Sequence, residues 1–248
     1  MLLSRMLIGA GILAAGVGVA SGQTDKAIVV NDPRPLSEAI FQLEKALRQP
    51  ITYEDPAIYA YPGDYVDKTA EFGGRAARRV LLPRGGGLQF TFNSSELSGT
   101  HAQTNALVKR LIETFNQSYP DGAQFELRDT GRVYHVVPVV VRQKTGAIVP
   151  HESPLDQPIT VVAQDTDAMS AISAILAAVK TQRGSSILVG NVPIGLLVRV
   201  KVSLASDNES ARTLLVRVLQ TASPTLSWRL LCGTEPGCYL NIHDARTQ

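Results

Sequence analysis

A short strand–helix–strand pattern recurs four times along this chain, and this recurrence constrains the fold more than any single motif. In the first copy, the apolar run Ala27–Val30 predicts a buried strand. One helix face is predicted by apolar residues at spacings of three and four, which are Leu36, Ile40, Leu43 and Leu47. Pro35 suits the first helical position, Pro50 forbids continuation, and a second strand then resumes at Ile51.

The second copy repeats this order and adds a hairpin. It begins with a strand over Gly87–Phe92, followed by a helix that Thr100 and Gln103 cap as a capping box. Its buried helix face is predicted by Val108, Leu111, Ile112 and Phe115. Asp129-Thr130-Gly131 predicts the turn between the two hairpin strands.

The third and fourth copies follow the same scheme. The third has a strand over Ile159–Val162, a helix capped by Thr166 or Asp165, and a return strand after Gly184. The fourth has a half-exposed strand over Leu196–Leu204, a capping box at Ser206 and Glu209, and a closing hairpin. Their helix faces are predicted by Ile172, Ile175, Leu176 and Val179, and by Leu214, Leu215, Val218 and Leu219.

The four copies predict an α+β fold of two halves. Each half consists of paired small βαβ(β) units with helices packed on small mixed sheets, because one helix and two or three strands bury too little surface alone. We expect a leader over residues 1–22, a first half over 23–143, a linker over 144–158 and a second half over 159–248. The linker is rich in proline and polar residues.

The first residues resemble an export signal. Arg5 supplies the positive charge, Met6–Ala20 is an uncharged apolar run, and small residues precede Gln23, where cleavage is expected. A retained anchor is the open alternative. No later run is apolar enough to span a bilayer, so a periplasmic or secreted protein without a transmembrane segment after cleavage is expected.

Two cysteines fit an oxidising compartment. Cys232 and Cys238 flank a turn-forming run between two apolar stretches, which predicts a disulfide across a hairpin with a stabilisation of about 2 kcal/mol. Five residues separate them, whereas a redox C-x-x-C motif has two. A zinc site would need further ligands, and His243 is the nearest candidate.

Composition gives an ordinary globular balance. Hydrophobic residues make up 44% and charged residues 19% of the chain, and the formal net charge is +2. A balance so close to neutral gives no reason to expect nucleic acid as a partner.

No catalytic motif is present in the sequence, and the four histidines lack metal-ligand spacing. We therefore predict no catalytic, cofactor-binding or metal-binding residues, and no enzyme, although a triad assembled in space stays open. The adjacent carboxylates Glu54 and Asp55 could serve acid–base chemistry, but a polar strand end before a proline turn is the favoured interpretation.

An interaction surface is the favoured kind of site. Rigid amphipathic tyrosines cluster after the first copy, and a basic segment follows them. The candidate surface residues are Tyr53, Tyr59, Tyr61, Tyr65, Arg75, Arg78, Arg79 and Arg84. Tyrosines also fill the edges of small cores, and the Gly85–Gly87 run could cradle an anion, although a solvated basic loop is favoured there.

The opening stretch resembles the short N-terminal periplasmic module of secretins and TonB-dependent receptors. The matching residues are Pro35 to Ile40, Leu43 and Leu47, then Pro50 to Tyr53, and the fourth copy resembles the module too. That resemblance implies interaction domains that form rings or contact a partner without catalysis. The membrane part that follows the module in those families is absent before Gln248, so an adaptor or assembly part is implied.

These observations favour an exported, non-catalytic interaction protein of the cell envelope, with an envelope protein as partner. A sheet edge in such small units offers strand addition to a partner, and an oligomer is compatible with it. The alternative is a periplasmic binding protein for a peptide, glycan or anion, with no cofactor in either case.

Overall fold

The computed structural model describes residues 24–56, 64–72, 79–143, 145–183, 186–233 and 237–246. The predicted leader and its cleavage site lie outside these residues. Helices and several mixed sheets build the chain, so the predicted α+β class with paired βαβ(β) units is confirmed. No described helix is long and apolar enough to cross a membrane.

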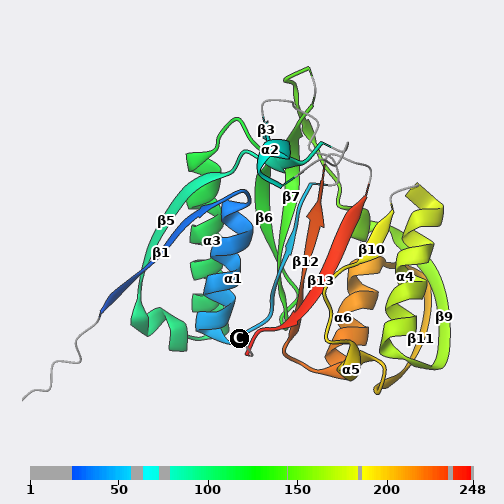
Figure 1. Cartoon of the computed structure of the whole chain (residues 1–248). Coiled ribbons are helices and arrows are strands. Elements are labelled where there is room, and N and C mark those ends of the chain that lie inside the picture. Colours follow the sequence, from blue (N-terminus) through cyan, green and yellow to red (C-terminus); the bar gives the residue numbers. More distant parts are fainter. Residues whose placement is uncertain are drawn as a thin grey trace, which may run out of the picture.

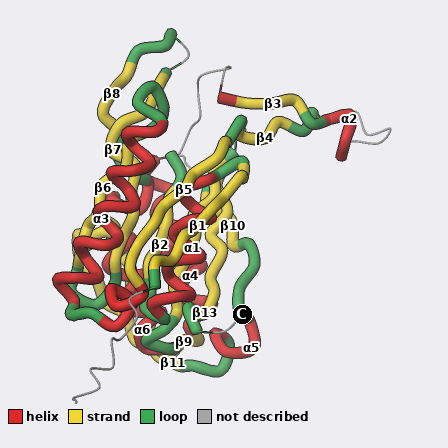
Figure 2. The backbone as a smooth tube through the Cα atoms, turned by 90° about the vertical axis from the view of Figure 1, so that its left-hand side faces the viewer, coloured by secondary structure: helices red, strands yellow, loops and turns green. Residues whose placement is uncertain are grey.

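The first half follows the order of the first two sequence copies. Its main elements are β1 (Asp25–Asp32), α1 (Pro35–Leu47), β2 (Ile51–Glu54), β5 (Gly86–Asn93), α3 (His101–Ser118), β6 (Gln124–Asp129) and β7 (Tyr134–Arg142). A small hairpin lies between β2 and β5 and consists of β3 (Tyr65–Asp67), α2 (Thr69–Phe72) and β4 (Leu81–Pro83). Figure 2 shows this hairpin standing apart from the main body.

The second half repeats the same order. Its main elements are β9 (Pro158–Asp167), α4 (Ala168–Arg183), β10 (Ile187–Val189), β11 (Lys201–Ser210), α6 (Ala211–Ala222), β12 (Leu226–Cys232) and β13 (Cys238–Asp244). Short pieces complete the chain, namely η2 (Ser94–Ser98), β8 (Ile148–Pro150), η3 (Pro154–Asp156) and α5 (Ile194–Leu197).

Each half has the same three layers. An antiparallel ribbon, β1–β5 or β9–β11, covers one side of the two helices. Three strands cover the other side: a short strand pairs in parallel with one strand of a hairpin, as β2 pairs β7 and β10 pairs β13. The hydrophobic cores are likewise separate, one built from residues between 28 and 136 and one from residues between 155 and 242.

A single seven-stranded sheet joins the two halves. Its path is β10-β13-β12-β2-β7-β6, with β8 added on β7, and the halves meet where β12 pairs in parallel with β2 (Figure 1). The short register of this joint pairs Arg229 with Tyr53 and Leu230 with Glu54. The two halves therefore do not carry separate small sheets in this region but share one.

The helices of the two halves cover opposite faces of this sheet (Figure 1). On β2, Tyr53 belongs to the core of the first half, while Glu54 reaches Arg212 of α6 on the other face. On β12, Leu230 belongs to the core of the second half, while Arg229 lies over the ring of Phe41 in α1. Both faces are consequently covered at the joint.

Local sequence signals located most helices correctly but misplaced two caps. The capping box of Thr100 and Gln103 is present at α3. At α4 the cap is Asp167, which accepts a hydrogen bond from Ser170 N, rather than Thr166 or Asp165. At α6 the cap is Ser210, and the predicted Ser206 and Glu209 lie inside β11. The strands β9 and β11 extend beyond their apolar residues, so α4 and α6 begin later in the sequence than predicted.

The predicted strand over Leu196–Leu204 is wrong in its first part. Ile194–Leu197 forms one helical turn, closed by Val198 N donating to Ile194 O. This turn places Leu197 in the core. The strand starts only at Lys201, and Val198 is exposed. The predicted half-exposed strand therefore begins too early in the sequence.

Candidate functional site

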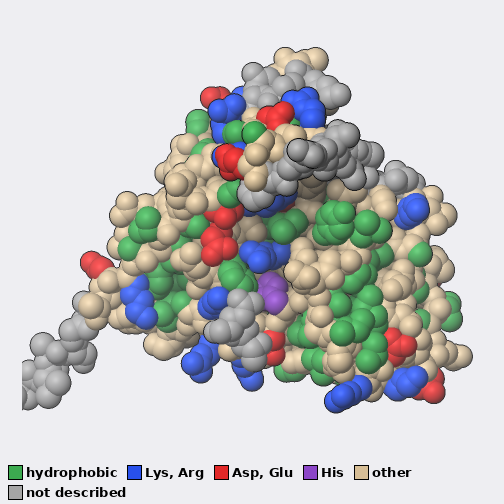
Figure 3. Space-filling model, viewed as in Figure 1, with side chains coloured by type: hydrophobic (Ala, Val, Ile, Leu, Met, Phe, Trp, Pro, Cys, Tyr) green, Lys and Arg blue, Asp and Glu red, His purple; other side chains and the backbone are tan. Residues whose placement is uncertain are grey.

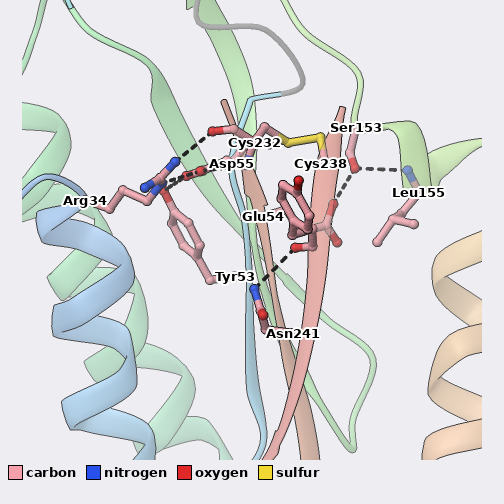
Figure 4. The surroundings of a disulfide bond; sticks show 10 residues. Arg34, Tyr53, Glu54, Asp55, Ser153, Leu155, Cys232, Cys238 and Asn241 are labelled. Atoms are coloured by element: carbon pink, nitrogen blue, oxygen red, sulfur yellow. Dashed lines mark hydrogen bonds and ion pairs between the residues drawn. A yellow bond between two sulfur atoms is a disulfide. The ribbon is translucent and has the colours of Figure 1, made fainter. Parts of the chain in front are cut away.

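The two carboxylates at the end of β2 are buried at the joint between the halves. Glu54 accepts two hydrogen bonds from Arg212, Nε to Oε1 and Nη2 to Oε2, both at 2.8 Å. Ser153 also donates its hydroxyl to Glu54 (Figure 4). Burial disfavours the charge of Arg212, but the Glu54 carboxylate outweighs it, and the pKa of Arg212 is raised. The pair is a buried, bidentate salt bridge.

Asp55 ties the first half to the disulfide hairpin of the second. It accepts hydrogen bonds from Tyr53 OH at 2.8 Å, Arg34 Nε at 2.6 Å and Cys232 N at 3.0 Å (Figure 4). Arg34 also donates to Cys232 O at 2.7 Å. The predicted disulfide between Cys232 and Cys238 is present, and it closes the hairpin at this point.

The favoured interpretation of Glu54 and Asp55 as a simple strand end is therefore incomplete. Both side chains are fully buried and ion-paired, so neither is open to a substrate for acid–base work. Their partners, Arg34 and Arg212, were not singled out in the sequence. Nothing local indicates the Arg212 contact, because the two residues are far apart along the chain and meet only through the shared sheet.

Two further contacts at the joint also pair a carboxylate of α1 with a basic side chain of the second half. Glu44 of α1 accepts a hydrogen bond from Ile51 N and pairs with His243 of β13 at 2.6 Å. Glu38 of α1 lies 3.7 Å from Arg229 of β12. In three pairs at this joint, Glu54–Arg212, Glu44–His243 and Glu38–Arg229, the first half thus supplies the carboxylate and the second half the basic side chain.

A chain of hydrogen bonds that resembles a catalytic triad joins the side chains of Asp129, His101 and Tyr134. His101 Nε2 lies 2.7 Å from Asp129 Oδ2, and its Nδ1 lies 2.8 Å from Tyr134 OH. Burial and the Asp129 charge raise the pKa of Tyr134 above its usual range. These hydrogen bonds connect the start of α3 to the β6–β7 turn.

A pocket of about 350 Å³ lies beside Arg34, between the two units of the first half. Its lining combines apolar residues, arginines and acids, among them Leu36, Phe115, Phe125, Arg34, Arg84, Arg142, Asp64 and Asp121. Asp64 is engaged by Arg142, and its carbonyl accepts a hydrogen bond from Arg84 N. The pocket is concave, partly apolar and of mixed charge, which suits a small ligand with an anionic group.

The candidate surface residues divide between core, pocket and hairpin. Tyr53 is a core residue with 2% exposure, not a surface residue, and it stacks on Phe125 at the base of the pocket. Burial and the charges of Asp55 and Asp64 raise the pKa of Tyr65. Arg84 lines the pocket, whereas Arg79 pairs with Asp67 in the exposed hairpin. Tyr59, Tyr61, Arg75 and Arg78 lie outside the described residues.

Two glycines of the run next to Arg84 belong to the ribbon, and the third, Gly85, lies in the connection before it. Gly86 and Gly87 pair with Asp32 and Asn31 of β1. A side chain at Gly85 would meet Asp32 O at 2.1 Å, and its φ is +62°, so glycine is required there. The favoured solvated loop is therefore wrong for Gly86 and Gly87, which are paired strand residues, while Gly85 lines the pocket beside Arg84.

The outer side of the second half carries an exposed apolar cluster that sequence reasoning missed. Leu188 of β10 pairs across the sheet with Tyr239 of β13, and the two side chains are 51% and 53% exposed. Figure 3 shows apolar side chains gathered over β13 and β10. On the far side of β10 from β13, no described strand is paired. Such a patch beside a free strand edge is typical of a docking surface.

Among the described residues, no group of three or more His, Cys, Asp or Glu side chains could hold a metal ion. Comparisons of the chain with protein-family models, curated proteins and solved structures found no match.

Proposed function

We propose that this chain is an exported, non-catalytic adaptor that docks a protein partner on the outer side of its second half. The docking side consists of β10, α4 and the exposed Leu188 and Tyr239. The observation that carries the proposal is the free edge of β10 with its exposed apolar neighbours. An oxidising location is supported by the leader-like start and by the Cys232–Cys238 disulfide.

The first half supports this assignment because the corresponding side of that half is already a docking surface. β2 and α1 are its counterparts of β10 and α4, and they receive β12 and β13 of the second half. Phe41 of α1, for example, contacts His243 edge-on with ring centroids 5.3 Å apart. The side that binds within the chain in one half is thus open in the other.

Site-specific photocrosslinking in intact cells tests the adaptor function. A photoreactive residue at Leu188 is expected to give a discrete protein adduct, since this position lies at the centre of the proposed surface. The matched control is the same residue at Val29, which is 67% exposed on β1 of the other half. Equal labelling from both positions would contradict the proposal, and so would the absence of any adduct from Leu188 in a folded protein.

A second candidate function is binding of a small anionic ligand, favoured by the pocket beside Arg84. Inorganic phosphate, citrate and short peptides with a free carboxylate are expected to raise the melting temperature, because ligand at about 100 times Kd stabilises by about 2.7 kcal/mol. Arg84→Gln should abolish the shift, whereas Arg79→Gln in the exposed hairpin should keep it. No shift with any of these probes would argue against this function.

A further inference from the structure

We infer that the partner on the open side of the second half is a second copy of this chain, related by a two-fold axis through Leu188. This inference rests on the adaptor proposal and names its partner. In the dimer, β10 of each copy pairs antiparallel with β10 of the other. The seven-stranded sheet then continues from one copy into the next.

The backbone of β10 is arranged for such a pairing. Cys238 N donates to Ser186 O and Gly190 N donates to Leu240 O, so the groups of Ser186 and Gly190 face β13. Because backbone groups alternate along a strand, those of Leu188 also face β13, and those of Ile187 and Val189 face outward. An antiparallel pair centred on Leu188 would therefore match Ile187 of each copy with Val189 of the other.

Residue equivalence between the halves places α4 on the same open side. Phe41 and Glu38 of α1 precede Ile51 by ten and 13 residues, as Ala177 and Ala174 of α4 precede Ile187 (51 − 41 = 187 − 177; 51 − 38 = 187 − 174). Phe41 and Glu38 contact the second half at the internal joint. Their counterparts in α4 are exposed or partly exposed alanines.

The surface of α4 permits close approach of a second helix. Small residues recur at helical spacing along its solvent-accessible side, namely Ser170, Ser173, Ala174, Ala177, Ala178 and Thr181. Antiparallel pairing about a two-fold axis normal to the sheet would put α4 beside its copy on one face. Helices pack at about 8–10 Å, and small side chains allow the shorter distances.

The chemistry of this side is also self-complementary. The carboxylates that meet basic side chains across the internal joint have neutral or basic counterparts here: Glu54 corresponds to Gly190 and Glu44 to Lys180. Asp55, which accepts from Cys232 N across the joint, corresponds to the neutral Asn191. A partner that carries the arginines of β12 and α6 would find no carboxylates at these positions. A neutral apolar edge such as β10 itself, with Leu188 against Leu188, fits better.

Head-to-tail stacking through the other free edge is disfavoured. Repeating the internal joint would pair β10 with β6 of the next copy, because β6 corresponds to β12. However, the Asn116 amide already accepts a hydrogen bond from Phe125 N at 3.0 Å and donates one to Phe125 O at 2.9 Å. These are outward backbone groups of β6, so its edge is protected by a side chain.

Crosslinking by a new cysteine tests the geometry directly. Residues opposite each other in the non-hydrogen-bonded position of an antiparallel pair have Cα atoms about 4.5 Å apart, within the range of a disulfide. Leu188→Cys is therefore expected to form a covalent dimer under mild oxidation. Val29→Cys, at a more exposed position in the first half, should stay monomeric at the same protein concentration.

Sedimentation measurements on the mature chain complete the test. The wild type is expected to be in concentration-dependent monomer–dimer equilibrium, and Leu188→Lys should raise the dimer Kd at least about tenfold, while Val29→Lys leaves it unchanged. Leu188→Lys keeps an exposed position exposed, so its folding can be verified by circular dichroism. A wild type that is monomeric at all concentrations, with no Leu188→Cys dimer, overturns the inference.

The adaptor function would survive that outcome only if Leu188 photocrosslinks to a different protein in cells. A monomer without any crosslinked partner at Leu188 contradicts both proposals. A dimer that persists in Leu188→Lys contradicts the assigned interface and means that the chain self-associates through another surface.

Discussion

Arg212→Met is expected to lower the free energy of unfolding by about 3–5 kcal/mol. Arg212 has 8% of its side chain exposed, and Glu54 has none. Removing the guanidinium leaves a buried carboxylate with the Ser153 hydroxyl as its remaining side-chain partner among the described residues. The desolvation of that charge is then uncompensated, which is why breaking such a pair is more harmful than never having it.

The double variant Glu54→Gln/Arg212→Met separates the pair from its surroundings. With both charges gone, no buried ion is left unpaired, so most of the loss in the single variant should be recovered. Asp156, which also contacts Arg212, keeps its 2.7 Å pair with Arg128 in both variants. Urea unfolding followed by the fluorescence of Trp228, the single tryptophan, gives the free energies.

A matched control lies on the same helix. Arg217 of α6 pairs with Glu209 at 2.9 Å, but their side chains are 43% and 37% exposed. Arg217→Met should therefore cost less than about 1 kcal/mol. If Arg212→Met and Arg217→Met cost the same, or if the double variant is no more stable than Arg212→Met, the pair is not what holds the joint.

Local patterns in the sequence were sufficient to locate α1, α3, α4 and α6 and the closing hairpin. The apolar stripe of α1 is buried as its spacing predicts, with Leu36, Ile40 and Leu43 at 1% exposure or less. The disulfide between Cys232 and Cys238 is also present as predicted, because the short turn-forming loop between them indicates a hairpin. Such features depend on neighbours within a few residues, which the sequence displays directly.

The joint was not predictable because the contacts between the two halves are long-range. Tyr53 looked like a surface tyrosine, since nothing nearby in sequence shows that it stacks on Phe125 beneath α1 and α3. Glu54 and Asp55 looked like a strand end, since their cations lie on other elements. The pairing of β2 with β12 creates this environment, and that pairing has only two residues in register.

The free edge of β10 has a similar explanation. In sequence, β10 and β2 are equivalent return strands after a helix, and neither pattern alone shows whether another strand covers its edge. The distinction arises because the second half docks on one of them. Leu188 consequently stands where Thr52, fully buried, stands in the first half.

Acidification is expected to destabilise the protein through His135, in a window above the usual range of carboxylates. His135 is fully buried on β7, with Nδ1 2.8 Å from Thr52 Oγ1 and its ring beside Trp228. Burial lowers the pKa of His135 to about 4. Glu54 opposes this effect, and the positive charges of Arg212 and Arg128 add to it.

The sign of the effect follows from proton uptake. An unfolded histidine has a pKa of about 6.5, so between pH 6.5 and 4 the unfolded chain binds a proton that the folded chain does not. Stability therefore falls as the pH is lowered through this window. A lowering to about 4 corresponds to a loss of about 3 kcal/mol at the acidic end.

His135→Gln removes the titrating group while keeping an amide that can hydrogen-bond Thr52. The variant is expected to lose less stability than the wild type between pH 7 and 4.5, measured by urea unfolding with far-ultraviolet circular dichroism. That readout is preferable to fluorescence here because the ring of His135 lies 5.4 Å from Trp228. His101 and His243 remain in both proteins, paired with Asp129 and Glu44, so the difference between the two pH profiles isolates His135. Parallel profiles would mean that His135 is not the group whose protonation opposes folding.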